Sequence, residues 1–264
     1  MPTFKLTLAY DGTTFVGWQR QASGESIQGW LEHVLQKLEK QPVPVAGAGR
    51  TDAGVHAHGQ VASVALTRDI DAATLRRALN ANLPDAIRVV DATLAPAGFH
   101  ARFASSSKVY QYRIWNSEVL DPFERRFVWH FPGAPLDAEA MDAAARLLEG
   151  THDFSSFQSA GATTATAVRT MFSSRVTRQA AASDAGSGDP AAAMPLLVYE
   201  VHGTGFLKHM VRSIAGTLVD VGRGRRAPAS IVALLEQQSR GCAGETAPPS
   251  GLFLVRVAYQ SPDL

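Results

Sequence analysis

Segments with apolar residues at strand spacing alternate along this chain with segments at helical spacing. The order of these segments limits the folds that the chain can adopt. Strand patterns occupy residues 1–10, 60–66 and 87–94, and apolar residues recur at helical spacing in 27–38 and 72–81. A strand–helix–strand–helix–strand block therefore ends near residue 101. The same alternation returns in the second half, where strands are expected at 107–115, 167–176, 196–202 and 252–259 and helices at 137–149, 206–221 and 230–238.

This order predicts an α+β fold with two similar halves, residues 1–104 and 105–264. Each half is expected to form a mixed or antiparallel sheet with helices on one face, and the halves are expected to flank a central basic cleft. Residues 42–45 are predicted to add a short strand ahead of a glycine-rich segment. Residues 179–194, rich in Ala, Gly, Ser and Asp, lack periodicity and are predicted to form a flexible hairpin insertion.

Composition narrows the class of protein and its compartment. The hydrophobic content of 45% is ordinary for a globular chain, and no apolar run approaches the roughly 20 residues of a membrane-spanning helix. The N-terminal ten residues follow a strand pattern, not that of a signal peptide. Cys242 is the only cysteine, which excludes an internal disulfide and favours a reducing, cytoplasmic location.

Charge alone leaves the question of a nucleic-acid partner open. The net charge of +1 argues weakly against a protein that coats nucleic acid, but a basic stripe can lie on a neutral chain. Arginines cluster at 76–77, 125–126 and 223–226. Solvated surface arginines explain these clusters as well as RNA contacts do.

The densest chemical signal is the segment GAGRTDAGVHAHGQ at residues 47–60. It lacks the Gly-Lys-Ser/Thr of a phosphate loop, and its glycine spacing does not fit a dinucleotide-binding loop. Asp52 suits nucleophilic or general-base work in a tight loop, although aspartate in such turns often only hydrogen-bonds its own backbone. His56 and His58 would share a face of a strand, so a metal site with Asp52 is a further alternative.

The segment GRTDAGVHAHGQV resembles the signature loop of the tRNA pseudouridine synthase A family. The resemblance is collinear over nearly the whole chain, and its signature loop is highly specific. The supporting segments, each modest alone, are 10–12 with 15–19, 99–103 ahead of 108–112, 151–154 with Thr170, 205–207 and 210–212 with Gly216, and 248–259. Residues 179–194 are longer than the family pattern leads us to expect, which affects a loop and not the chemistry.

The resemblance implies the pseudouridine synthase fold and isomerisation of uridine to pseudouridine in the anticodon stem-loop of tRNA, at positions thirty-eight to forty. In this reaction the N-glycosidic bond is cut, the uracil turns and a C–C bond forms, without a metal, nucleotide or redox cofactor. Asp52 matches the catalytic aspartate. It either attacks a carbon of the target nucleotide or removes a ribose proton, and the sequence does not decide between these roles.

The resemblance also assigns roles around Asp52. Tyr110 matches the active-site tyrosine, which stacks on the extruded base or assists proton transfer. Arg212 matches a basic residue that pairs with the catalytic aspartate, and Arg50 is placed to contact a phosphate or to fill the gap left by the base. Phe206 and Leu207 are expected to line the pocket. Core packing is the alternative for Tyr110, Phe206 and Leu207.

Partners follow from the same resemblance. Arg20, Arg76, Arg77 and Arg102 are candidates for contacts with the tRNA backbone, and family members act as homodimers in which one tRNA touches both subunits. Two other interpretations remain open. One is an RNA-binding protein of the same fold that has lost catalysis, and the other is a metal-dependent hydrolase that uses Asp52 with the two histidines.

Overall fold

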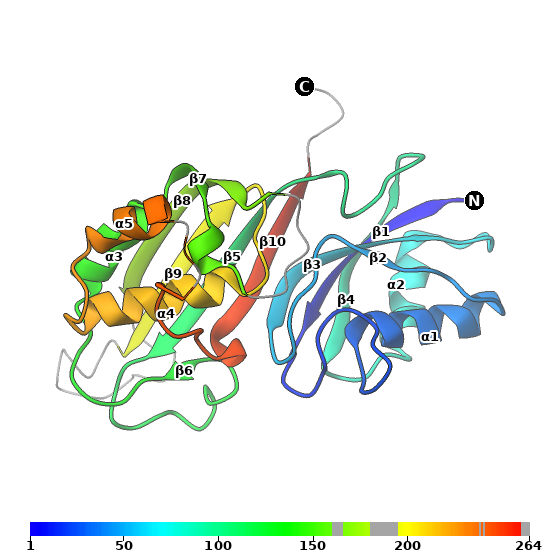
Figure 1. The fold of residues 1–264 in the computed structure, drawn as a ribbon. Coiled ribbons are helices and arrows are strands. Elements are labelled where there is room, and N and C mark those ends of the chain that lie inside the picture. Colours follow the sequence, from blue (N-terminus) through cyan, green and yellow to red (C-terminus); the bar gives the residue numbers. More distant parts are fainter. Residues whose placement is uncertain (160–165, 180–194, 238, 240, 260–264) are drawn as a thin grey trace. The chain divides into compact units, whose positions relative to one another are not determined.

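The computed structural model describes residues 1–159, 166–179, 195–237, 239 and 241–259. The chain divides into two compact units, one of Met1–Lys108 with Phe253–Leu264 and one of Val109–Leu252. Both units combine a sheet with helices, as Figure 1 shows, which confirms the predicted α+β class. Apart from its first residue, the predicted insertion at 179–194 lies outside the described residues.

The sheet of unit 1 is mixed, with the strand order β4-β1-β3-β10. These strands are β4 (Ile87–Ala95), β1 (Thr3–Tyr10), β3 (His56–Ala65) and β10 (Leu252–Tyr259). The central strand β1 is antiparallel to both β3 and β4, whereas β3 and β10 are parallel, with Phe253 opposite His56. The short β2 (Ala46–Gly47) pairs with β3. This pairing places the second half of the signature loop, which forms the start of β3 from His56 onward, inside the sheet.

Two helices in unit 1 begin where the sequence supplies a capping side chain. The Ser26 hydroxyl accepts a hydrogen bond from the Gly29 N–H at the start of α1 (Ile27–Glu39), and Asp71 caps α2 (Ala72–Asn80) through the Thr74 N–H. Such caps contribute about 1 kcal/mol each to helix stability. The buried side chains of the two helices are Ile27, Leu31, Val34, Leu35, Leu75 and Leu79, and those of β1 are Phe4, Leu6, Leu8 and Tyr10.

The strand predicted at residues 42–45 is wrong, because this segment is a loop bound to α1. The Val45 N–H donates to Glu32 Oε1 at 3.4 Å, and Gln28 Nε2 donates to the Val45 carbonyl at 3.1 Å. Pro42 and Pro44 have no N–H to give to a neighbouring strand. Side chains of α1 thus take the place of a sheet partner, and pairing begins only at β2.

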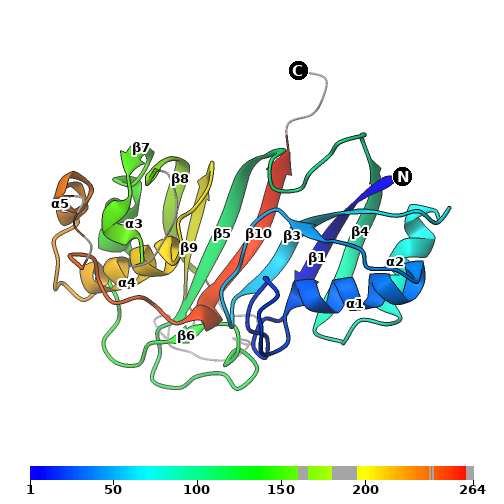
Figure 2. The ribbon, with the colours of Figure 1, turned by 45° about the vertical axis from the view of Figure 1, so that its right-hand side comes forward.

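The sheet of unit 2 has the order β5-β9-β8-β7, and Figure 2 shows these four strands in sequence. They are β5 (Ser105–Trp115), β9 (Leu196–Gly203), β8 (Val168–Gln179) and β7 (Gly150–Asp153), with β6 (Trp129–His130) paired to β5. β8 is antiparallel to both β9 and β7. Trp115, Val128, Leu196 and Val198 form an apolar cluster in this unit.

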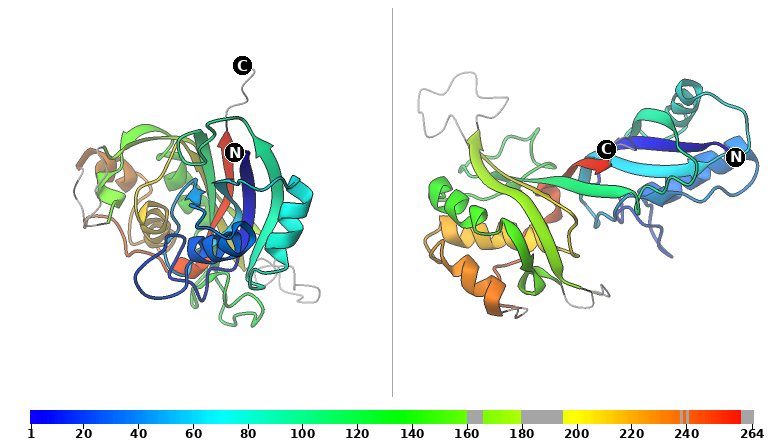
Figure 3. Two further views of the ribbon diagram at one scale, coloured as in Figure 1. Left: turned by 90° about the vertical axis from the view of Figure 1, so that its right-hand side faces the viewer. Right: turned by 90° about the horizontal axis from the view of Figure 1, so that it is seen from above.

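The helices of unit 2 are α3 (Ala138–Arg146), α4 (Met210–Gly222) and α5 (Ser230–Gln237), which lie on the same side of its sheet (Figure 3). The helix predicted from 206 begins four residues later, because His209 adopts a left-handed φ of 63°. Phe206 and Leu207 therefore lie in the preceding loop. Within the described residues, no helix is long and apolar enough to cross a membrane.

Candidate active site

The backbone of the Asp52 loop is held by the N-terminal strand and the loop that follows it. The Tyr10 and Thr51 hydroxyl groups lie 2.8 Å apart, and the Trp18 N–H donates to the Thr51 carbonyl at 3.0 Å. Tyr10 and Thr51 are both buried, and Asp52 itself is half-buried. The residue directly before the candidate catalytic carboxylate is thus bound through both its side chain and its carbonyl.

Two glycines permit the tight course of this loop. Asp52 begins a turn in which the Val55 N–H donates to its carbonyl at 3.2 Å, and Gly54 occupies the left-handed region at φ 76°. Gly17, at φ 107°, packs directly on the loop, since a Cβ at this position would lie 2.6 Å from the Thr51 carbonyl oxygen. Gly17, in the supporting segment 15–19, and the signature loop are therefore packed against each other.

Gln60 ties the beginning of the signature loop to the same hydroxyl network. Its Nε2 donates to the Gly49 carbonyl at 3.0 Å and to the Tyr10 hydroxyl at 3.5 Å. Burial raises the pKa of Tyr10 to about 12, although its hydrogen bonds to Thr51 and Gln60 act in the opposite direction. The Tyr10 phenol therefore stays protonated at neutral pH, and its hydroxyl joins Thr51 to Gln60, whose amide holds Gly49.

Tyr10→Phe is expected to lower the rate of the reaction that the resemblance implies, while leaving the affinity for tRNA unchanged. Removing the hydroxyl leaves Thr51 with one buried partner fewer, which costs about 1–3 kcal/mol of unfolding free energy. A small displacement of the Asp52 loop should lower the single-turnover rate by about 10- to 100-fold. Thermal unfolding, tRNA binding and single-turnover rates measured on the same preparation separate these effects.

Tyr199→Phe is the matched control, because the Tyr199 hydroxyl makes an equally buried contact with Ser174 Oγ at 3.2 Å in unit 2. It should lose comparable stability without the loss of rate. Equal losses of rate in both variants would mean that Tyr10 supports the fold and does not position Asp52.

The two histidines share a face of β3, as the strand pattern predicted. Their rings stack on Phe253, with centroids 4.8 Å from His56 and 5.0 Å from His58. The buried His56 accepts a hydrogen bond at Nδ1 from the Gly12 N–H at 3.0 Å and lies 3.2 Å from the Asp11 carboxylate. Among the described residues, no three His, Cys, Asp or Glu side chains gather as metal ligands do. His56 thus contributes to packing and to the anchoring of Gly12.

In unit 2 the structure brings Tyr110 and Phe206 together. Tyr110 is buried on β5, and its ring centroid lies 5.0 Å from that of Phe206 in an edge-to-face arrangement of 76°. Leu207 is also buried, and its N–H donates to Met210 Sδ at 3.5 Å. The loop before α4 therefore places an apolar ring against the candidate active-site tyrosine.

Arg212 lies in the first turn of α4 and is half-buried. Its Nε donates to the Ala247 carbonyl at 2.7 Å, and the Ala247 N–H donates back to the Arg212 carbonyl at 3.2 Å. Its charge also acts on the phenol of Tyr112, although burial is the larger influence and raises the pKa of that tyrosine. The guanidinium group is thus held in a fixed direction by the segment that precedes β10.

The arginines predicted to contact tRNA differ in their surroundings. Arg20 pairs with Glu32 at 3.1 Å, Arg76 donates to the Val90 carbonyl at 3.3 Å and Arg77 to Thr74 Oγ1 at 2.8 Å. These contacts fix the three side chains to α1, α2 and β4. Arg50 is exposed beside Thr51, and Arg102 is exposed on the loop before β5, where it acts on Lys108.

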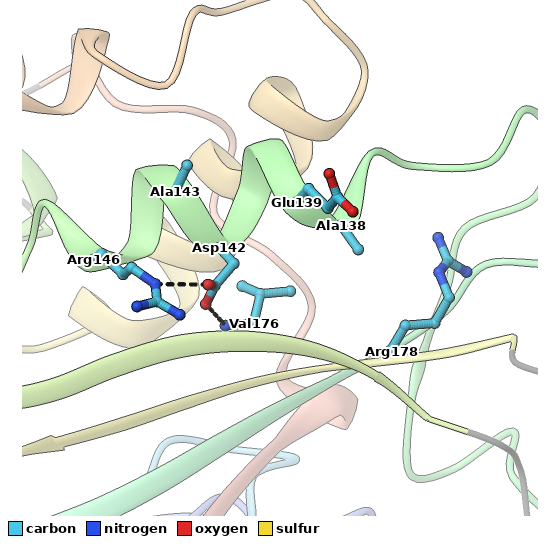
Figure 4. A pocket seen from close by; sticks show the side chains of 7 residues that line it. All are labelled: Ala138, Glu139, Asp142, Ala143, Arg146, Val176 and Arg178. Atoms are coloured by element: carbon cyan, nitrogen blue, oxygen red, sulfur yellow. Dashed lines mark hydrogen bonds and ion pairs between the residues drawn. The ribbon is translucent and has the colours of Figure 1, made fainter.

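A surface hollow in unit 2 contains a carboxylate whose hydrogen bonds are made within the fold. It lies between α3 and β8, as Figure 4 shows, and is lined by Ala138, Glu139, Asp142, Ala143, Arg146, Val176 and Arg178. The Asp142 carboxylate accepts from Arg146 Nε at 2.7 Å and from the Val176 N–H at 2.9 Å. The bond from Val176 joins α3 to β8, and that from Arg146 lies within α3, so the carboxylate serves the fold.

Three residues of unit 1 were not singled out from the sequence: Tyr10 and Gln60, which hold the Asp52 loop, and Lys108. Tyr10 and Gln60 belong to strands whose alternation suggests ordinary core residues. The pairing of β1 with β3, in which Gln60 stands opposite Leu8, brings them to the loop. Gln60, the penultimate residue of the signature loop, is buried, and a buried amide needs hydrogen-bond partners, which is the one signal for its structural role.

Comparison with known proteins agrees with the resemblance of the signature loop. A family model described as tRNA pseudouridine synthase matches residues 7–104 and 144–260. The tRNA pseudouridine synthase A of Methylacidiphilum infernorum is 45% identical over 257 residues, which cover 97% of this chain and 95% of that protein. The proteins of the same name from Solibacter usitatus and Myxococcus xanthus are each 45% identical, over 98% of this chain and 100% and 93% of their own lengths. The chain belongs to the tRNA pseudouridine synthase family.

Proposed function

We propose that this protein isomerises uridine to pseudouridine in the anticodon stem-loop of tRNA, at positions thirty-eight to forty, and that Asp52 starts the reaction. The observation that carries the proposal is the signature loop. It places a half-buried aspartate on a backbone that Tyr10, Trp18 and Gln60 hold in place. Membership of the family supplies the substrate class.

The reaction requires an exposed nucleotide and an ionised carboxylate. The target base must leave its stack before a protein group reaches its sugar bond, which costs a few kcal/mol that pocket contacts offset. Asp52 then either attacks a carbon of the nucleotide or removes a ribose proton. The N-glycosidic bond breaks, the uracil turns, and its C5 bonds to the ribose carbon while the C5 proton leaves and N1 takes up a proton. No electrons are gained or lost overall, so the isomerisation needs no redox cofactor.

The residues of unit 2 are proposed to receive the base and to orient the carboxylate. Tyr110, with its edge against Phe206, offers a ring face to the extruded uracil and a hydroxyl for proton transfer. Leu207 and Phe206 are proposed to exclude water from the base. The family pattern assigns Arg212 as the partner of Asp52, and a forked pair of hydrogen bonds from a guanidinium would fix the direction of the carboxylate.

The proposal also covers the compartment, the oligomeric state and the residues that contact tRNA. We expect a cytoplasmic homodimer in which one tRNA contacts both subunits. Arg50 is proposed to contact the substrate at the active site, and Arg20, Arg76, Arg77 and Arg102 to contact the tRNA backbone. The support for these contacts is the exposure of the five side chains and their positive charge.

A tritium-release assay tests the proposed reaction. Because C5 of the uracil loses its hydrogen when it bonds to ribose, tRNA transcribed with 5-tritiated uridine should release tritium to water. We expect the purified protein to release it at the same rate with and without excess EDTA. Release that stops in EDTA and returns with zinc would favour the metal-dependent interpretation. Binding of tRNA without any release would favour the catalytically inactive RNA-binding protein.

A further inference from the structure

A large exposed aromatic ring stands among cations on the loop before β5. Phe103 is 78% exposed, although a phenyl side chain normally lies inside a fold. The His100 ring lies 4.3 Å from the Phe103 ring, and the Arg102 guanidinium lies over the same ring at 5.8 Å from its centroid. The exposed ring thus lies beside a polar ring and a cation, a combination found in sites that stack unpaired bases.

The structure presents this ring on a firmly held backbone. Ala101 is fully buried, its N–H donates to Ser63 Oγ at 3.1 Å, and its carbonyl accepts from the Tyr259 hydroxyl at 2.8 Å. One turn of backbone is closed by the Ala104 N–H, which donates to the His100 carbonyl at 3.0 Å. Hydrogen bonds that join Ala101 to β3 and β10 therefore fix the backbone just before Phe103, and the turn closed by Ala104 encloses the ring's residue.

Arg102, which lies over the ring, and Lys108, five residues beyond Phe103, have no anionic partner among the described residues. Burial lowers the pKa of Lys108, and the charge of Arg102 lowers it further, so the two positive charges act on each other. Lys108 Nζ donates to Ser105 Oγ at 3.2 Å. In the described parts of the chain, no carboxylate forms an ion pair with either cation. Such a pair of like charges is relieved by an anion, and a phosphate group has the charge and oxygens to bind both.

The same cluster reaches the signature loop. Lys108 lies beside Gly49, since a Cβ built on that glycine would be 3.4 Å from Lys108 Cε. Gly49 directly precedes Arg50, and its carbonyl is fixed by Gln60. A nucleotide held by Phe103, Arg102 and Lys108 therefore lies next to the loop that carries Asp52.

We propose that Phe103, Arg102 and Lys108 form a binding site for one unpaired nucleotide of the RNA substrate, distinct from the uridine that reacts. The base stacks on the exposed Phe103 ring, and the phosphate lies between the two cations. This site rests on the proposed function in that its ligand is tRNA. It would hold a loop nucleotide next to the target and so help to place the target uridine at Asp52.

Binding of an anticodon stem-loop hairpin tests the stacking. Phe103→Ala should weaken the affinity about 10- to 100-fold, the usual effect of losing one base–aromatic stack. Phe103→Trp should keep the affinity, because indole offers a larger face. Leu94→Ala is the control, since Leu94 is 66% exposed in the same unit. Affinity of Phe103→Ala equal to that of Leu94→Ala and the wild type would overturn the proposal.

Fluorescence locates the nucleotide. With 2-aminopurine placed at each loop position in turn, one position should lose fluorescence on binding to the wild type and keep it with Phe103→Ala. Quenching that is the same in both proteins at every position would contradict stacking on Phe103.

Salt dependence tests the phosphate contact. The double variant Arg102→Gln/Lys108→Met should lower the slope of log affinity against log salt by about 0.7, the value for one neutralised phosphate on a single strand, and each single variant should lower it by less. Slopes equal to that of the wild type would overturn this part of the site.

These measurements separate the site from the proposed reaction. Binding without tritium release would contradict the reaction and still leave the stacking measurable. If the wild type fails to bind the hairpin, both proposals fail. If Phe103→Ala changes the oligomeric state in sedimentation but not the RNA affinity, the ring is a contact between copies of the chain and the nucleotide site is wrong.

Discussion

Asp52→Asn is expected to abolish pseudouridine formation while folding and tRNA binding persist. The amide keeps the shape of the carboxylate but lacks its charge and basicity. Loss of proton transfer alone lowers a rate by about 10²- to 10⁴-fold, and loss of a nucleophile lowers it further. Single-turnover tritium release at saturating enzyme is the measurement, because it reports the chemical step and not product release.

The fold of this variant should be intact because the loop is held through other groups. The contacts that fix it are made by the Thr51 hydroxyl and carbonyl, the Gly49 carbonyl and the Asp52 carbonyl. Thermal unfolding and hairpin affinity should therefore match those of the wild type. Asp69→Asn, at an exposed position of the same unit, is the control for loss of a charge. Substantial turnover by Asp52→Asn would remove Asp52 from the mechanism.

Arg212→Met is expected to cost far more activity than Arg212→Lys. The side chain is held by the Ala247 carbonyl, so its guanidinium group is oriented before substrate binds. Removing a preorganised charged partner lowers a rate by about 10²- to 10³-fold. Lysine keeps the charge but loses the planar fork, so it should retain an intermediate rate. Single-turnover rates of the three proteins over a range of pH are the measurement.

The pH profile separates an effect on Asp52 from a simple loss of fold. A partly desolvated carboxyl group without a cationic partner takes up a proton more readily, and a protonated Asp52 can neither attack nor accept a proton. The methionine variant should therefore regain part of its rate as pH rises. Arg146→Met, on the exposed side of α3, should behave like the wild type. If Arg212→Met is as active as the wild type at neutral pH, the pairing with Asp52 is wrong.

Hydrophobic spacing and capping residues correctly predicted those helices and strands whose structure depends mainly on their own residues. β1 follows from its alternating apolar residues, and α1 follows from helical spacing after the capping Ser26. In these two elements short-range physics and the native fold agree. Asp52 was indicated by the resemblance of the signature loop to a family, since its residues alone left a turn role and a metal site open.

The secondary-structure predictions that proved wrong concern segments whose structure is determined by more than their own hydrophobic pattern. Residues 42–45 were predicted to form a strand. They form a loop because Gln28 and Glu32 of α1 supply hydrogen bonds to Val45. The apolar run from 206 was predicted to be helical, but the helix begins only at Met210 because His209 adopts a left-handed conformation. β7 was not predicted, since the residues of Gly150–Asp153 show no alternation and become a strand only by pairing with β8.

The surroundings of the candidate site depend even more on tertiary structure. Tyr10 and Gln60 are far apart in sequence and meet through the register of β1 and β3. Phe103 and Lys108 lie within a short segment, yet the exposure of the ring and the contact of Lys108 with Gly49 follow only from the fold. The positions of Phe103 and Lys108 in the sequence do not show which way either side chain points, or that Lys108 lies beside Gly49.

Mapping pseudouridine in tRNA from cells that lack this gene tests the central claim most directly. The account predicts that pseudouridine disappears from positions thirty-eight to forty of the anticodon stem-loop and persists elsewhere in the tRNA. A plasmid with the wild-type gene should restore it, and a plasmid encoding Asp52→Asn at equal protein level should not. Pseudouridine that remains at these positions without the gene, or returns with the asparagine variant, would contradict the account.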